Sequence, residues 1–114
     1  MPDPRGLLPL KPLVFQVLLA LSAGERHGWS LVREIQQAEA GARVLPANFY
    51  RTLRGMLADG LIEEGAARRS EDDERRRYFR LTPLGRETAR LEAHRLHALV
   101  ADSRTRRLLA RSRH

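Results

Sequence analysis

Apolar side chains recur at helical spacing in three segments of the first half of the chain. Residues 12–23 are apolar almost all round, which predicts a buried central helix that begins at Pro12 and ends at Gly24. Residues 28–41 carry one apolar stripe and a polar face, and residues 46–59 repeat that pattern between a proline and a glycine. The spacing therefore predicts three helices, of which the first is central.

Shorter runs with β-forming residues predict strands. Residues 61–68 and 76–82 each read as a strand, and the charged run between them reads as the tip of a hairpin. A further strand of three residues is expected in the apolar run of residues 42–46.

A long helix is predicted after the hairpin. Thr82 can cap it and Pro83 suits its first turn, and the helical pattern continues through residue 111. The order of elements is typical of a winged helix-turn-helix: a mainly α fold with a small β-hairpin and a long C-terminal dimerisation helix. We expect a DNA-binding domain over residues 1–82, and a dimerisation helix with a basic tail over residues 83–114.

Length and composition narrow the class of protein. The chain has 114 residues, enough for one modest core, and no cysteine, which excludes disulfides and thiolate metal sites. The apolar run of residues 7–21 is short and interrupted by prolines and a lysine, so we expect no membrane span, no signal peptide and a cytoplasmic protein. The net charge is +7, and the last eleven residues hold five arginines and no acid. This balance suits a polyanionic partner, and equally a soluble protein with a basic tail.

The third predicted helix carries the candidate chemistry. Its outer face shows no acid before Asp59, whereas an ordinary solvated face mixes both signs of charge. Asn48 can pair with adenine and Arg51 with guanine in the major groove, while Arg54 is better placed for the DNA backbone. Ala47 keeps the face narrow. Tyr50 can donate its hydroxyl to a phosphate, or be a half-buried core residue.

The predicted hairpin tip supplies a second set of cations. Arginines there can reach phosphates or the minor groove. The candidates are Arg68, Arg69, Arg75, Arg76 and Arg77. Four acids, residues 71–74, lie between them and either orient the arginines or keep the empty wing soluble. A solvated loop without a role is the alternative.

Evidence for an enzyme is thin. His94 and His97 are three residues apart on the last predicted helix, but no carboxylate or cysteine is placed to complete a metal site. There is no glycine-rich phosphate loop, and no serine has a credible base partner. We expect no catalysis, no metal and no cofactor.

Three stretches resemble the PadR family of bacterial transcription regulators: "LLALSAGERHGWSLVREI", "LPANFYRTLRGMLADGLIEE" and "RRYFRLTPLGRE". The shared features are His27-Gly28 followed by an aromatic, Pro46 with Tyr50 four residues on, Leu53, Gly60-Leu61-Ile62, and the run from Arg76 to Gly85. They cover roughly the first three-quarters of the chain. The resemblance implies a dimeric DNA-binding repressor, often released by a phenolic acid or a drug, in the short form with a single C-terminal helix.

This chain departs from the family pattern at three positions. Trp29 stands where tyrosine is usual, Leu45 replaces the usual serine cap and Ala47 the usual glycine. Without a side-chain cap, backbone N–H groups at the start of the third helix remain available to a phosphate.

The last predicted helix has more apolar surface than one small core needs. We expect the surplus to be buried against a second copy, in an interface that spaces two reading helices for a palindromic operator. The expected interface residues are Leu84, Leu91, Leu96, Leu99 and Val100. A pocket for a small aromatic or drug-like effector is expected there, with Phe15 or Trp29 as its wall. A winged-helix module for protein–protein contact or RNA binding is the alternative function.

Overall fold

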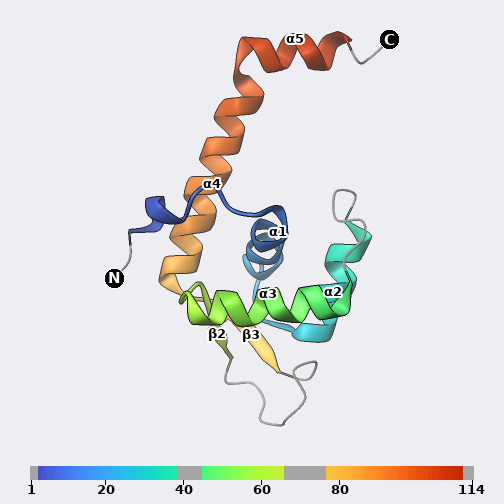
Figure 1. The fold of residues 1–114 in the computed structure, drawn as a ribbon, viewed down its shortest axis with the longest axis vertical. Coiled ribbons are helices and arrows are strands. Elements are labelled where there is room, and N and C mark those ends of the chain that lie inside the picture. Colours follow the sequence, from blue (N-terminus) through green and yellow to red (C-terminus); the bar gives the residue numbers. More distant parts are fainter. Residues whose placement is uncertain (1–2, 39–44, 66–76, 112–114) are drawn as a thin grey trace.

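The computed structural model describes residues 3–38, 45–65 and 77–111 (Figure 1). A short 3-10 helix, η1 (Pro4–Leu7), precedes the first α-helix. The α-helices are α1 (Pro12–Leu21), α2 (Gly28–Gln37), α3 (Pro46–Ala58), α4 (Pro83–Ala101) and α5 (Ser103–Arg111). The strands are β1 (Arg26–His27), β2 (Ile62–Glu64) and β3 (Tyr78–Leu81). This order confirms the predicted mainly α winged helix-turn-helix.

The described strands form one antiparallel sheet in the order β1-β3-β2. β2 and β3 are the predicted hairpin, with Ile62 opposite Leu81. β1 was not predicted, because two residues are too few to show a periodicity, and their pairing with β3 joins segments far apart in the sequence. Of the strand expected at residues 42–46, residues 42–44 lie outside the described part of the chain.

Helix α1 lies at the centre of the molecule, between α4 and α2 and next to α3 (Figure 1). Its Val17 and Leu18 are fully buried, together with Phe49 from α3 and Phe79 from β3. The helix is not buried all round as predicted, because Leu19 is 45% exposed.

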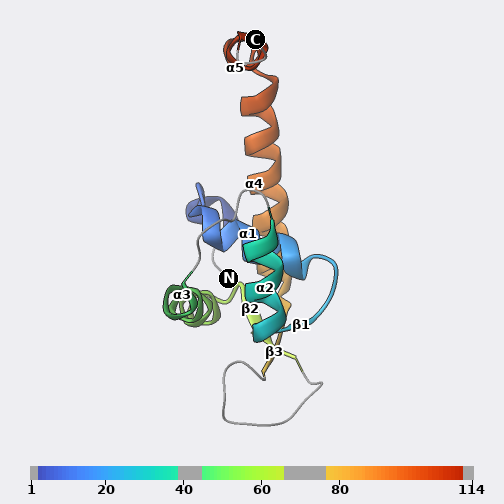
Figure 2. The same ribbon diagram turned by 90° about the vertical axis from the view of Figure 1, so that its right-hand side faces the viewer.

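Helix α4 starts as predicted. The Oγ1 atom of Thr82 accepts a hydrogen bond from the Gly85 N–H at 2.9 Å and donates one to the Gly60 carbonyl at 2.6 Å, which fixes the helix start to the end of α3. The first half of α4 packs against α1 and η1, and its second half extends away from the rest of the molecule (Figures 1 and 2).

The prediction of one continuous C-terminal helix is wrong. Asp102 is extended, with ψ 137°, and it separates α4 from α5. Its carboxylate accepts hydrogen bonds from the N–H of Arg104 at 2.8 Å and from the guanidinium of that residue at 2.9 Å. An aspartate at this position caps a new helix, and this competes with continuation of the old one.

The core continues past the expected boundary at residue 82. Leu84, Thr88 and Glu92 on α4 are buried with the winged helix. The first half of α4 therefore belongs to the same core, and the division at residue 82 is proposed as one of function rather than of folding.

Glu92 ties the N-terminal segment to α4. Its side chain is 2% exposed, and its two carboxylate oxygens accept hydrogen bonds from the Arg95 guanidinium at 2.6 and 2.8 Å. The Oε2 atom also accepts one from the Leu10 N–H at 3.2 Å. The Arg95 hydrogen bonds hold the pKa of Glu92 below its ordinary value of 4.5, against the opposing effect of burial, and the Leu10 N–H adds to the lowering.

We expect this carboxylate to make folding acid-sensitive. Because the pKa is lower in the folded state, the stabilisation is present above the unfolded pKa and is lost as the pH falls through the folded one. Glu92→Gln should lower the free energy of unfolding at pH 7 by about 1–2 kcal/mol, because the charge-assisted bonds to Arg95 are lost. The loss stays modest because water can still hydrate the Arg95 guanidinium. Urea denaturation at pH 7 and pH 3 checks this: the cost of the substitution should shrink at pH 3. An equal cost at both pH values would rule out the charge as its cause.

Candidate nucleic-acid interface

Helix α3 presents one face to the core and the opposite face to solvent. Phe49, Leu53 and Met56 are buried, as their spacing predicts. The outer face, called the reading face from here on, is exposed and consists of Ala47, Asn48, Arg51, Arg54 and Gly55. Figure 2 shows α3 end-on at one edge of the molecule.

The two side chains predicted to read bases are hydrogen-bonded to each other. The Arg51 guanidinium donates to the Asn48 Oδ1 at 3.0 Å, one helical turn back. This bond orients both groups and leaves most of the guanidinium donors and the Asn48 amide donors for other acceptors. The pair is thus arranged for hydrogen bonding to a shared surface.

The start of α3 has no side-chain cap. Leu45 occupies the N-cap and makes no side-chain cap bond, and Pro46 lies in the first turn. The first N–H groups of the helix, at the positive end of the helix dipole, favour an anion. The leucine that replaces the family's usual serine at position 45 thus leaves the start of α3 without a side-chain cap.

Tyr50 and Arg54 flank the reading pair. Tyr50 is half-buried and packs edge-on against Phe49, with ring centroids 5.2 Å apart. This contact favours the core interpretation of its ring. Arg54 is exposed, one turn beyond Arg51 along α3.

The wing is described only at its base. Arg68, Arg69, Arg75 and Arg76 lie outside the described residues. Arg77 pairs with Glu64 at 3.3 Å, and Arg80 pairs with Glu63 across the strands at 2.9 Å. Such part-exposed pairs contribute little to stability, so exchanging a carboxylate for a phosphate costs little.

The residues predicted for a dimer interface differ in exposure. Leu84 is 6% exposed and packs in the core of its own chain, so the prediction that it meets a second copy is wrong. Leu91 and Leu96 are half-buried, whereas Leu99 and Val100 are about half exposed. Two further exposed leucines, Leu108 and Leu109, were missed because they lie in the arginine-rich tail that the sequence presents as polar.

The two aromatic residues predicted for an effector pocket lie on different helices, α1 and α2. Phe15 is half-buried on α1. Trp29 is 48% exposed, and the guanidinium carbon of Arg33 lies 4.7 Å from its ring centroid. Trp29 and Arg33 line a groove of about 250 Å³ between α2 and the start of α3, where Tyr50 also lies. Arg33 was missed, although its spacing of four residues from Trp29 is a usable signal for this cation–π contact.

Two other kinds of site receive no support within the described ranges. No three histidine, aspartate or glutamate side chains there are grouped so that they could hold a metal ion. Over the same ranges, no helix combines the length and the apolar character that a membrane crossing requires.

Known proteins share both the fold and the sequence pattern. A PadR-like transcriptional regulator from Bacillus cereus superposes with a TM-score of 0.68 and 21% identity, over 92% of this chain and 93% of that one. A complex structure of the H. salinarum protein RosR (hsRosR-S1) gives 0.65 and 25%, over 96% and 90%. An uncharacterized 37.1 kDa protein in transposon TN4556 of Streptomyces fradiae is 38% identical over 78 residues, or 68% of this chain. The matched stretch spans 21% of that relative.

A family model confirms the resemblance noted in the sequence. Residues 17–91 match the model of the transcriptional regulator PadR-like family, from within α1 to the middle of α4. This range contains most of the winged helix, including the whole of the reading face. The chain therefore belongs to the PadR-like family of transcriptional regulators.

Proposed function

We propose that the protein is a homodimeric transcriptional repressor in the cytoplasm that reads a palindromic DNA operator with α3. The reading face carries this proposal: it is exposed and acid-free, and its Asn48 and Arg51 are held together by a hydrogen bond. An amide and a guanidinium suit the edges of adenine and guanine in the major groove.

Contacts to the DNA backbone are assigned to groups around the reading face. The uncapped start of α3 and Arg54 suit phosphates on either side of the groove. The wing arginines Arg68, Arg69, Arg75, Arg76 and Arg77 are proposed to reach the neighbouring backbone or minor groove. These contacts add affinity without sequence information.

Dimerisation is assigned to the projecting part of α4. Leu99 and Val100 continue the stripe of Thr88, Glu92 and Leu96 beyond the end of the core, and they are exposed in the single chain. A second copy packed two-fold on this stripe would place two reading faces on successive half-sites. Repression then follows if the dimer occupies DNA that the transcription machinery needs.

Substitutions of two arginines on α3 can distinguish contacts to bases from contacts to the DNA backbone. Arg51→Ala should weaken binding to the preferred duplex by roughly 1–3 kcal/mol and relax preference at one or two base pairs. Arg54→Ala, the matched control, should weaken preferred and random duplexes alike and reduce the salt dependence. Fluorescence anisotropy with duplexes selected from a random pool measures both.

Competition with RNA in the same assay tests the alternative function, RNA binding. If structured RNA competes as well as the selected duplex, or if the two variants behave identically on selected and random DNA, α3 is not a reader of DNA sequence.

A further inference from the structure

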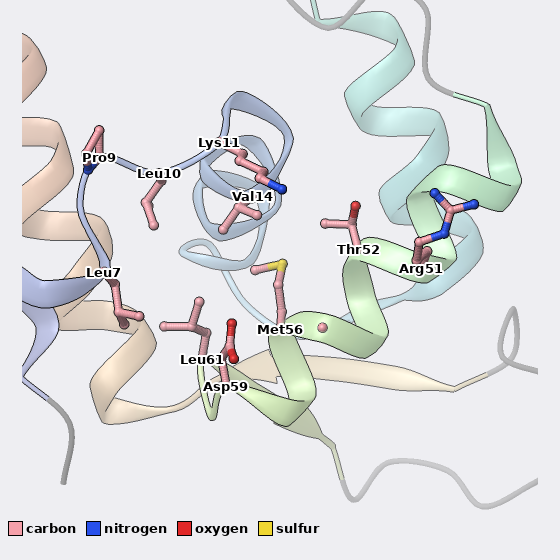
Figure 3. A pocket seen from close by; sticks show the side chains of 11 residues that line it. Leu7, Pro9, Leu10, Lys11, Val14, Arg51, Thr52, Met56, Asp59 and Leu61 are labelled. Atoms are coloured by element: carbon pink, nitrogen blue, oxygen red, sulfur yellow. The ribbon is translucent and has the colours of Figure 1, made fainter.

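A groove of about 400 Å³ runs beside α3, next to the reading face (Figure 3). One wall is the chain from η1 into α1, including Leu10, Lys11 and Val14. The other wall is the side of α3, where Arg51, Thr52, Met56 and Asp59 lie at helical spacing. A volume of this size suits a small molecule. We call it the α3 groove.

The wall formed by the N-terminal segment is fixed in place. The Leu10 N–H donates to the buried Glu92 carboxylate at 3.2 Å, and Leu7 and Leu10 pack against the core. The groove therefore exists before any ligand arrives, and it is tied to α4, the helix proposed to dimerise.

The two ends of the α3 groove carry opposite charges. Lys11 points from the N-terminal wall toward α3, and Thr52 and Arg51 lie at the same end (Figure 3). Lys11 makes no ion pair within the part of the chain that the structure describes, so its charge has no counter-ion there. Asp59 lies at the opposite end, beside Leu61. One end attracts a carboxylate and the other repels a second one.

Aliphatic side chains line the space between these ends. Met56 points toward Val14 across the groove, and Leu10 adds to this apolar floor (Figure 3). None of the described residues that line the groove is aromatic, so they offer no ring to stack on. Thr52 and Asp59 are two turns apart along α3, which makes the groove about 10 Å long. That length suits a medium aliphatic chain.

We propose that the α3 groove binds a medium-chain aliphatic monocarboxylate, with the carboxylate at Lys11 and the chain along Leu10 and Val14, over the buried Met56. Resting on the proposed function, we add that this ligand opposes DNA binding, because it would occupy a groove that shares Arg51 and Gly55 with the reading face. By thermodynamic linkage, bound DNA then lowers the affinity for the ligand by the same factor.

Met56 gives a direct readout of the site. The chain has two methionines, Met1 and Met56, so labelling their methyl groups with ¹³C gives two resonances. Octanoate should shift the Met56 methyl signal in a saturable way. Octanamide should bind roughly ten-fold more weakly, the effect of one charge-assisted hydrogen bond.

Three variants test the assigned ends. Lys11→Gln should weaken octanoate about ten-fold, and Lys11→Arg should retain most of the affinity. The side chain of Lys11 is exposed and makes no cap bond, so neither change should affect folding. Octanedioate should bind worse than octanoate to the wild type, and Asp59→Asn should reduce that difference.

Several results would overturn the proposed ligand. They are an unmoved Met56 signal, an equal shift with inorganic phosphate, equal affinity for octanamide, or tighter binding of 2-naphthoate than of octanoate. An equal shift of the Met56 signal with phosphate would instead indicate that the groove binds the phosphates of the DNA backbone.

The regulatory step is measured separately, by anisotropy of a selected duplex with and without saturating octanoate. Loss of DNA affinity supports it, and unchanged affinity overturns it. If no duplex binds at all while Met56 still reports octanoate, the proposed function fails and the ligand site stands.

Discussion

The Leu99→Asp, Val100→Asp double variant is expected to be a folded monomer that has lost tight binding to a palindromic duplex. Both side chains are about half exposed in the single chain, so the charges do not enter its core. In a dimer both wild-type side chains would be buried, so each substitution loses about 1.5–3 kcal/mol of hydrophobic stabilisation of the dimer. Burying the new carboxylate adds a further cost. Sedimentation equilibrium at micromolar concentration gives the mass, and anisotropy gives the DNA affinity.

His94→Asp is the matched control for the double variant. His94 is exposed on the other side of α4 from Leu99 and Val100, so the same charge there should leave mass and affinity unchanged. A monomeric wild type, or a double variant that keeps full affinity for the palindrome, would contradict the dimer.

Gly85→Ala is expected to destabilise the fold by about 2–3 kcal/mol, because the added methyl has no room. A Cβ at Gly85 would lie 1.9 Å from the backbone carbonyl oxygen of Leu61, and backbone cannot rotate away. The change therefore pushes the start of α4 off the turn that leads into β2. The midpoint of urea denaturation, measured at one protein concentration, reports the loss.

Gly55→Ala is the control, since both glycines are helical. A Cβ at Gly55 meets no atom within 4 Å, so the substitution should raise stability by about 0.5–1 kcal/mol through helix propensity. Equal effects of the two substitutions would show that the close approach at Leu61 does not limit the fold.

Local signals in the sequence predicted the elements that carry the proposed function. The spacing of Phe49, Leu53 and Met56 assigned both faces of α3 correctly, and Thr82 with Pro83 marked the start of α4. These features depend on neighbours within one helical turn, which a sequence displays directly.

What was missed depends on distant contacts or on competition between neighbours. β1 exists because Arg26 pairs opposite Phe79, and no residue near Arg26 indicates that strand. Leu84 has the spacing of an interface leucine, but the turn before β2 closes over it. The α3 groove needs Lys11 beside Thr52, which only the fold brings together.

The end of α4 shows the second kind of miss. The helical pattern passes through Asp102 without interruption, yet its carboxylate caps α5 and breaks the helix there. A capping residue inside a periodic stretch is ambiguous from sequence, because cap and helix interior compete at similar free energies.

A salt titration of DNA binding tests the central claim most directly. If arginines of α3 and the wing neutralise phosphates while Asn48 and Arg51 read bases, log affinity for a selected palindrome should fall linearly with log salt, by roughly 0.9 per phosphate contact. A scrambled duplex should show a similar slope at lower affinity. A flat response, or equal affinity for the palindrome and the scrambled duplex at every salt concentration, would contradict the account.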